Sequence, residues 1–293
     1  MMRCLLFAGL LWAGLSWTGG GAAGPIGNWQ TNMETSYGAT LIANYAMVAH
    51  RHMHEYGTTT AQLAEISVAT RAHAMRNPEA VKCMTDLLFD PVSEITVQDV
   101  LESRIIADPL HLLECCMVSD GGGAAVIVSA DVAKGIKKAP VWLIGSGEAT
   151  KYSENGGDIT TSAGAQSGPI AFGEAGIAPG EIDIAMIYDS FTITVAVCME
   201  DLGFFKKGEL GDFVKDDGLR FDSALKPALN TDGGGLSSNH PGMRGLFLLL
   251  ESVRQLRGES TSQVDGAQLA VAHGNGGNLG GTHTGGTIIL AKD

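Results

Sequence analysis

Cysteine is scarce in this 293-residue sequence, and no cysteine pair has the spacing of a known motif. The five cysteines are odd in number and none follows Cys-x-x-Cys spacing, so neither a disulfide framework nor a zinc site is indicated. Reduced cysteines in an intracellular protein are the expected state. His50, His52 and His54 alternate, whereas metal ligands on one helix face stand three or four residues apart, and we predict no metal site.

Basic residues are also few. The sequence has 19 Lys and Arg against 32 Asp and Glu, a net charge of -13, and this balance argues against nucleic acid as the main partner. An anionic ligand could still be held locally by helix N-termini and single basic side chains. The basic candidates are Arg244, Arg254, Arg257, Lys206 and Lys207, and the alternative for most of them is a solvated surface.

A hydrophobic run long enough to cross a membrane is not found. The apolar stretch Cys4–Trp17 is too short for a comfortable span, and we predict no membrane-spanning helix. Together with Met1–Arg3 and the small residues up to Gly24 it resembles a secretory signal peptide. The alternative is the apolar end of a buried strand and its turn, exposed because upstream sequence is missing.

What the sequence does have is an alternation of helical and strand patterns. The strands are near-continuous apolar runs, which is typical of an α/β fold with helices on both faces of a sheet. A polar break at Lys134–Lys138 predicts a domain boundary, giving segments 1–24, 25–138 and 139–293. The expected helices are 41–56, 60–77, 169–178, 191–202 and 246–257, and the expected strands are 124–128, 140–144, 182–187, 268–272 and 287–291.

The stretch Asn230–Gly245 is rich in glycine, contains His240 and runs directly into a helical pattern. Glycine permits positive φ and close approach of a ligand, and the first N–H groups of a helix point toward the loop before it. We interpret the stretch as a binding loop with His240 at its mouth. The alternative is a tight turn before a core helix, with a histidine that only bonds the backbone.

Two more candidate loops follow predicted strands, Tyr188–Phe191 and Ala272–Gly277. With the His240 loop they offer a phenol, a carboxylate, a hydroxyl, two imidazoles and many backbone N–H groups. Such a set can hold a thioester or carbonyl oxygen and move protons near neutral pH. The candidate catalytic residues are Tyr188, Asp189, Ser190, His240, His273 and Asn275, and the candidate coenzyme-binding residues are Gly234, Gly235, Ser237, Arg244 and Gly276.

The phrases YDSFTITVAVCMEDLGFFKKGE, NTDGGGLSSNHPGMRGLFLLLESVRQLRGE and HGNGGNLGGTHTGG, in this order, resemble the thiolase superfamily, and most closely its sterol-carrier and lipid-transfer branch. The resemblance covers roughly residues 25–293. It implies two similar α/β halves in a layered αβαβα sandwich, usually a homodimer, acting on acyl-CoA thioesters. Coenzyme A would be part of the substrate, with no bound cofactor. Some aldolases of this branch pair with a small OB-fold protein.

The resemblance also suggests residue roles. His240, in the His-Pro-Gly loop, would donate to an oxyanion hole for the thioester carbonyl. Where ordinary thiolases carry Asn-Glu-Ala-Phe and sterol-carrier thiolases carry His-Asp-Cys-Phe, this chain has Tyr188–Phe191. Ser190 has no useful acidity at pH 7, so Tyr188 becomes the expected acid/base. The C-terminal Cys-x-Gly loop is matched by His273–Asn275, without its cysteine.

The thiolase nucleophile would lie upstream of the region that resembles the family. Four cysteines of the N-terminal half lack a Cys-x-Ser context, namely Cys4, Cys83, Cys115 and Cys116. We therefore expect an N-terminally truncated member with an incomplete first half, whose segment 1–24 is not a signal and which is cytoplasmic. The predicted function is acyl transfer or retro-aldol or thiolytic carbon–carbon cleavage in lipid or steroid metabolism. The alternative is a catalytically impaired acyl-CoA-binding or structural partner.

Overall fold

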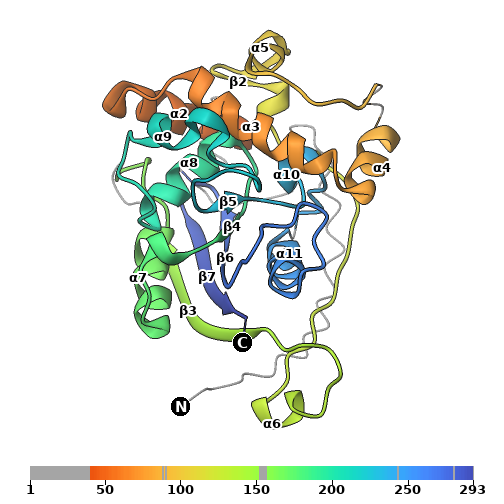
Figure 1. Cartoon of the computed structure of the whole chain (residues 1–293). Helices are drawn as coiled ribbons and strands as arrows, with labels where there is room; N and C mark the ends of the chain where they lie inside the picture. The colour runs from red at the N-terminus through yellow and green to blue at the C-terminus, as the bar shows by residue number, and fades with distance from the viewer. Residues whose placement is uncertain are drawn as a thin grey trace, which may run out of the picture.

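The computed structural model describes residues 40–87, 89, 91–151, 157–242, 244–279 and 281–292. The predictions for segment 1–24 lie outside these residues. A mixed five-stranded sheet has the order β3-β7-β6-β4-β5 (Figure 1). In it β4 runs parallel to β5 and β6, whereas β7 is antiparallel to both β6 and β3. The strands are β3 Trp142–Lys151, β4 Ile184–Ile187, β5 Ala228–Leu229, β6 Leu269–Gly277 and β7 His283–Ala291.

Helices cover both faces of this sheet, as predicted. On one face lie α7 (Gly164–Ala175) and α8 (Thr192–Asp201), and on the other lies α11 (Gly245–Arg257) (Figure 1). Alternate side chains of β4 serve the two faces: Ala185 and Ile187 join the core with α7 and α8, whereas Ile184 and Met186 join the core with α11. We call these the α7/α8 face and the α11 face.

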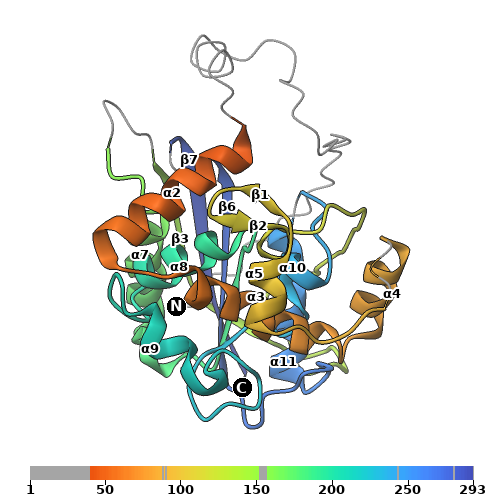
Figure 2. The same cartoon turned by 90° about the horizontal axis from the view of Figure 1, so that it is seen from above.

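The earlier part of the chain forms a helical layer at the sheet edge where β4 and β6 end (Figures 1 and 2). Its first helix is α2 (Leu41–Tyr56), capped by Thr40 and ended by Gly57 at φ 74°. A Thr59–Gln62 capping box starts α3 (Thr60–Ala74). These two predicted helices are confirmed, although α3 ends before Asn77. The other helices are α4 Pro78–Asp86, α5 Val97–Glu102, α6 Ala130–Ala133, α9 Leu210–Val214 and α10 Gly234–Ser237.

Short elements complete the described chain. Strands β1 (Ile105–Ala107) and β2 (Leu110–His111) pair with each other in a separate two-stranded sheet. Three single 3-10 turns are η1 Leu112–Glu114, η2 Pro179–Glu181 and η3 Lys215–Asp217. Over the described ranges, no helix combines the length and apolar character needed to cross a membrane.

The predicted buried strand 124–128 was wrong. The segment belongs to neither described sheet, and Val126 is 88% exposed and Ile127 40% exposed. The residues just before it lie against α11, where a Cβ on Gly123 would lie only 2.5 Å from Leu250. An apolar β-branched run becomes a buried strand only when a neighbouring strand and a covering layer are present, and the described residues supply neither.

Glycine misled the prediction of β3. We expected a buried strand over 140–144, ending before Gly145, but β3 continues to Lys151 as a half-exposed edge strand. The two glycines instead allow α7 to pass close by. A Cβ on Gly145 would lie 2.2 Å from the Ala171 carbonyl oxygen, and one on Gly147 would lie 2.1 Å from that of Ser167.

The predicted strand end at residue 272, the loop Ala272–Gly277 and the strand start at residue 287 were also wrong. Strand β6 continues to Gly277 and β7 begins at His283, so most of this stretch is a β-ladder with Asn275 opposite Gly285. The candidate site residues His273 and Asn275 therefore lie on a strand, where alternate side chains point to the same face of the sheet.

Candidate active site

Tyr188 directly follows β4, and its N–H donates to the carbonyl oxygen of His273 on β6 at 2.9 Å. In the register of these parallel strands Ile187 is opposite His273. Because side chains alternate along a strand, Ile187 faces α7 and α8 whereas Tyr188 packs with the core of α11. His273 points the same way as Ile187, since its ring lies beside Gly164 at the start of α7.

On the α11 face, Tyr188 and His240 form a pair. Their ring centroids are 5.0 Å apart and the planes are inclined by 80°, an edge-to-face arrangement. Burial, with Arg244 nearby, lowers the pKa of His240 to about 4, so its ring is neutral at pH 7. Burial raises the pKa of the Tyr188 phenol, which stays protonated. The Nε2 atom of His240 is buried and has no hydrogen-bond partner in the described structure.

Asp189 fixes the glycine-rich loop against β4. Its buried carboxylate accepts hydrogen bonds from the N–H groups of Gly235 at 2.8 Å and Leu236 at 3.2 Å. Burial raises the pKa of Asp189 to about 6, although the Arg244 charge opposes this shift. Gly234 has φ +68°, and a Cβ there would lie 2.1 Å from Asp189 Oδ2, so a side chain at this position would displace the carboxylate.

Arg244 is the second anchor of this loop, and it is fully buried. Its Nη2 lies 2.7 and 2.8 Å from the two carboxylate oxygens of Asp232, and its Nε lies 3.2 Å from Asp189 Oδ1. Its Nη1 donates to the carbonyl and side-chain oxygens of Asn239. All three nitrogens are therefore engaged inside the protein, which argues against the predicted contact between Arg244 and a coenzyme A phosphate.

The other predicted coenzyme-binding residues are mostly buried too. The Gly235 N–H is used by Asp189, and the Ser237 hydroxyl accepts from Arg71 Nε at 3.0 Å. Only Gly276, at the end of β6, is exposed. Most polar groups of the glycine-rich loop, which includes the short helix α10, therefore bond to other groups of the protein and stabilise the loop itself.

The side chains of the three predicted loops do not all face the same side of the sheet. Ser190 is buried, with its hydroxyl 3.0 Å from that of Thr194. His273 is fully buried, its Nδ1 lies 2.8 Å from the Thr287 hydroxyl, and its Nε2 has no partner among the described groups. Asn275 also lies on the α7/α8 face, with its Oδ1 unpaired. His273 therefore faces away from the Tyr188–His240 pair, whereas Asn275 lies beyond the last register pair of β4 and β6. A site built by all three loops stays a prediction.

Sequence reasoning missed the segment Cys115–Ser119, which lies between the Tyr188–Phe191 loop and the His240 loop. Cys116 N–H donates to the Ser190 carbonyl, Met117 N–H to that of Gly235, and His240 N–H to the Ser119 hydroxyl at 3.0 Å. Burial raises the pKa of the Cys116 thiol to about 12, so it is no thiolate at neutral pH. The sequence feature that could have indicated this segment is the glycine-rich run Ser119–Gly123, whose glycines allow the chain to approach α11 closely.

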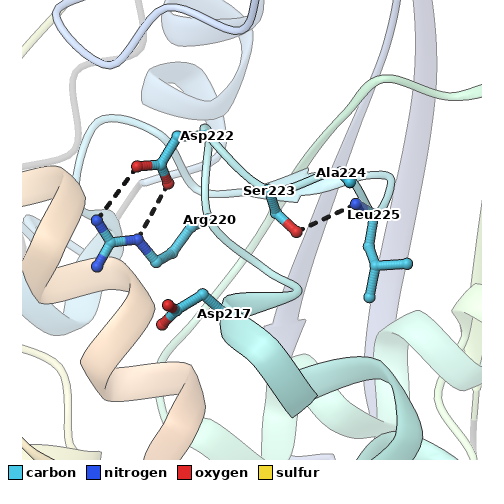
Figure 3. A pocket seen from close by; sticks show the side chains of 6 residues that line it. All are labelled: Asp217, Arg220, Asp222, Ser223, Ala224 and Leu225. Carbon is cyan, nitrogen blue, oxygen red and sulfur yellow. Dashed lines mark hydrogen bonds and ion pairs between the residues drawn. The ribbon is translucent and has the colours of Figure 1, made fainter.

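A surface pocket lies elsewhere in the described chain. It has a volume of about 520 Å³ and is lined by Asp217, Arg220, Asp222, Ser223, Ala224 and Leu225 (Figure 3). An adjoining hollow reaches Asp183, which precedes β4, so both lie at the end of the sheet opposite Tyr188. In Figure 3 Arg220 points at Asp222, its Nε 3.1 Å from Oδ1. No cluster of three or more His, Cys, Asp or Glu side chains arranged for a metal ion occurs in the described part of the chain.

The fold is an α/β sheet with polar loops at the carboxyl ends of β4 and β6. A histidine follows the glycine-rich turn beside these loops, and the sequence profile identifies the family to which this arrangement belongs. The sequence profile of the family described as Thiolase C-terminal domain-like matches residues 145–292. The chain therefore belongs to the thiolase family.

Known proteins similar to this chain are thiolases and thiolase-like aldolases. An acetyl-CoA acetyltransferase of Methanothermobacter thermautotrophicus is 39% identical over 88% of this chain and 64% of its own length. A steroid side-chain-cleaving aldolase of Thermomonospora curvata is 34% identical over 74% of this chain and 54% of its own length. The chain thus spans less than two thirds of either relative.

A solved structure confirms the thiolase fold. The structure titled Ltp2-ChsH2(DUF35) aldolase superposes with a TM-score of 0.79 at 30% identity, over 92% of this chain and 70% of its own.

Proposed function

We propose that this protein acts on acyl-CoA thioesters through the Tyr188–His240 pair. The observation that carries the proposal is the neutral His240 ring, whose buried Nε2 is unpaired beside a protonated phenol. A neutral imidazole N–H can stabilise the oxyanion of a thioester or its enolate, and the phenol can donate a proton. Coenzyme A enters as part of the substrate, and the named activities of the relatives agree with this chemistry.

In a retro-aldol cleavage of a β-hydroxyacyl-CoA, the Cα–Cβ bond breaks and its electron pair moves into the thioester as an enolate. His240 Nε2–H would stabilise the enolate oxygen. The Tyr188 phenol would give its proton to Cα and recover one from the β-hydroxyl group, so that an aldehyde or ketone and a shorter acyl-CoA result. Acyl transfer would use the same oxyanion contact.

The second candidate is an acyl-CoA-binding protein without turnover. The observation that favours it is the state of the cysteines beside the site. Burial raises the pKa of both Cys115 and Cys116 to about 12, so neither supplies a thiolate nucleophile at neutral pH.

The assembly and location also belong to the proposal. We propose that the protein is a cytoplasmic homodimer with a domain boundary near residue 138. We also propose that it binds a small OB-fold partner protein. The similarity to an aldolase whose title names two components, Ltp2 and ChsH2, supports the partner. Size-exclusion chromatography with light scattering tests the homodimer, which predicts twice the 30.5 kDa chain mass.

The proposed activity is tested with β-keto- and β-hydroxyacyl-CoA substrates of several chain lengths. Release of coenzyme A and of aldehyde or ketone is measured for the wild type, Tyr188→Phe, His240→Ala and the matched control His50→Ala on the exposed side of α2. Turnover by the wild type and the control that both site variants lose supports the enzyme. Turnover unaffected by either site variant contradicts the assigned residues, and binding without any turnover favours the second candidate.

A further inference from the structure

One side chain of the helical layer contacts both the end of β6 and the segment that follows β4. Tyr45 of α2 is 3% exposed, and its hydroxyl donates to the carbonyl oxygen of Gly277, at the end of β6, at 3.4 Å. Its ring centroid lies 4.6 Å from that of Phe191, which follows β4. Tyr45 therefore connects two segments that are far apart in sequence from each other and from α2.

Polar groups of both segments surround the Tyr45 hydroxyl. Burial raises its pKa to about 12, while the nearby side chains of Ser190 and Asn275 oppose this shift as hydrogen-bonding partners. The hydroxyl is thus a protonated donor at all ordinary pH values. Ser190 is in turn bonded to Thr194 at the start of α8, so the contact extends into the helix behind the site.

The position of this contact gives it a specific role. The ladder between β4 and β6 has its last register pair at Ile187 and His273, and Tyr188 N–H makes the next bond to His273. Beyond that point the Tyr188–Phe191 segment and the end of β6 separate, and the Tyr45 side chain lies where it contacts both.

We propose that Tyr45 is a positioning residue that holds the Tyr188–Phe191 segment at a fixed distance from the end of β6 and so sets the geometry of the Tyr188–His240 pair. The consequence for activity rests on the proposed function, whereas the consequence for local structure does not. The two consequences are therefore measured separately.

Tyr56 provides a matched control on the same helix. Its hydroxyl lies 3.5 Å from the Thr160 hydroxyl and its ring packs against His52, so it also makes a polar and an aromatic contact, but it touches neither strand end. Tyr45→Phe and Tyr56→Phe each remove one hydroxyl and keep the ring packing. Both variants are therefore expected to fold.

The structural arm is amide hydrogen exchange of the purified chain. In Tyr45→Phe we expect exchange at residues 188–191 and 275–277, and at residues 283–285 that pair with the latter, to rise about fivefold, which corresponds to about 1 kcal/mol for one hydrogen bond. Residues 288–291 of β7 should be unchanged. In Tyr56→Phe both regions should exchange as in the wild type. Equal exchange of these regions in all three proteins would overturn the proposal.

The kinetic arm uses the acyl-CoA substrate that the wild type turns over. A positioning role predicts that Tyr45→Phe lowers kcat about tenfold with KM within twofold, because a displaced acid affects the transition state more than substrate binding. A merely stabilising role would leave kcat per folded molecule unchanged, as in Tyr56→Phe, and would overturn the proposal. Wild-type protein without turnover would contradict the proposed function, while the exchange result still decides the role of Tyr45.

Discussion

His240 and His273 share a lowered pKa and an unpaired ring nitrogen, but they lie on opposite faces of the sheet. Burial lowers the pKa of each to about 4, and each has an Nε2 atom without a partner in the described structure. His240 is partly exposed on the α11 face beside Tyr188, whereas His273 is fully buried on the α7/α8 face. An unpaired imidazole nitrogen therefore does not identify a site by itself. The face of the sheet on which it lies decides what it can reach.

The surroundings of His273 are tightly packed. A Cβ on Gly164 or Gly285 would lie 3.4 or 3.2 Å from its Cε1, and its Nδ1 begins a chain of contacts through Thr287 to Ser167. His273 is fully buried among the described residues, so its ring is not accessible from the surface. On the α11 face, the ion pairs of Arg244 with Asp189 and Asp232 hold the glycine-rich loop in place. They do not involve the His240 ring.

The largest effect that would sharpen this comparison is expected at Arg244. Arg244→Met leaves the carboxylates of Asp189 and Asp232 buried without their cation, and we expect a loss of 3–5 kcal/mol in the free energy of unfolding, measured with urea. The control Arg254→Met removes an exposed arginine 3.9 Å from Glu79 and should cost less than about 0.5 kcal/mol. Similar small losses in both variants would show that the loop does not depend on this ion pair.

A smaller effect, on rate, is expected at the phenol. Tyr188→Phe keeps the ring against His240 and removes only the hydroxyl, so we expect kcat on the preferred acyl-CoA to fall about hundredfold with stability nearly unchanged. Steady-state kinetics beside Tyr56→Phe give the measurement and its control. If kcat is retained in Tyr188→Phe, the proton comes from another group.

On the opposite face the expected effect is on stability alone. Thr287→Val breaks the chain from His273 Nδ1 to Ser167 and leaves buried polar atoms unpaired, at a cost of about 1–3 kcal/mol. Thermal and urea unfolding measure this loss, and kcat per folded molecule should stay as in the wild type. A drop in kcat without a loss of stability would place this face in the chemistry.

A further effect is a pH dependence of stability from His273. Its folded pKa of about 4 lies below the usual 6.5, so between these values the unfolded chain binds more protons and stability falls as pH falls. His273→Gln removes this contribution. The stability advantage of the wild type over the variant should therefore shrink between about pH 6.5 and pH 4 in urea titrations. An advantage that is constant with pH would contradict a buried neutral ring.

Much of the fold followed from local signals in the sequence. The caps of α2 and α3, the apolar run of β4 and the helical period of α11 were sufficient to predict these elements within a few residues. The failures involve glycine and partners distant in sequence. Gly145 and Gly147 serve a helix crossing, and Gly274–Gly277 belong to a ladder with β7, which no local pattern shows.

The candidate site was predicted in part. The sequence indicated Tyr188 and His240, and the structure places them side by side. The sequence could not show that Asp189 and Arg244 bond only to groups inside the protein, since burial of a charge depends on tertiary partners. The direction in which the His273 side chain points depends on its place in β6, and the predicted strand ended before this residue.

The most direct test of the account compares His240→Ala with His273→Ala in one experiment, measuring kcat on the preferred acyl-CoA and the free energy of unfolding for both. We predict that His240→Ala lowers kcat about hundredfold with a stability loss below about 1 kcal/mol, because its Nε2 holds no partner in the protein. For His273→Ala we predict a stability loss of about 2–3 kcal/mol with kcat per folded molecule nearly unchanged. Equal losses of kcat in the two variants, or the reverse pattern, would contradict the assignment of the site to the α11 face.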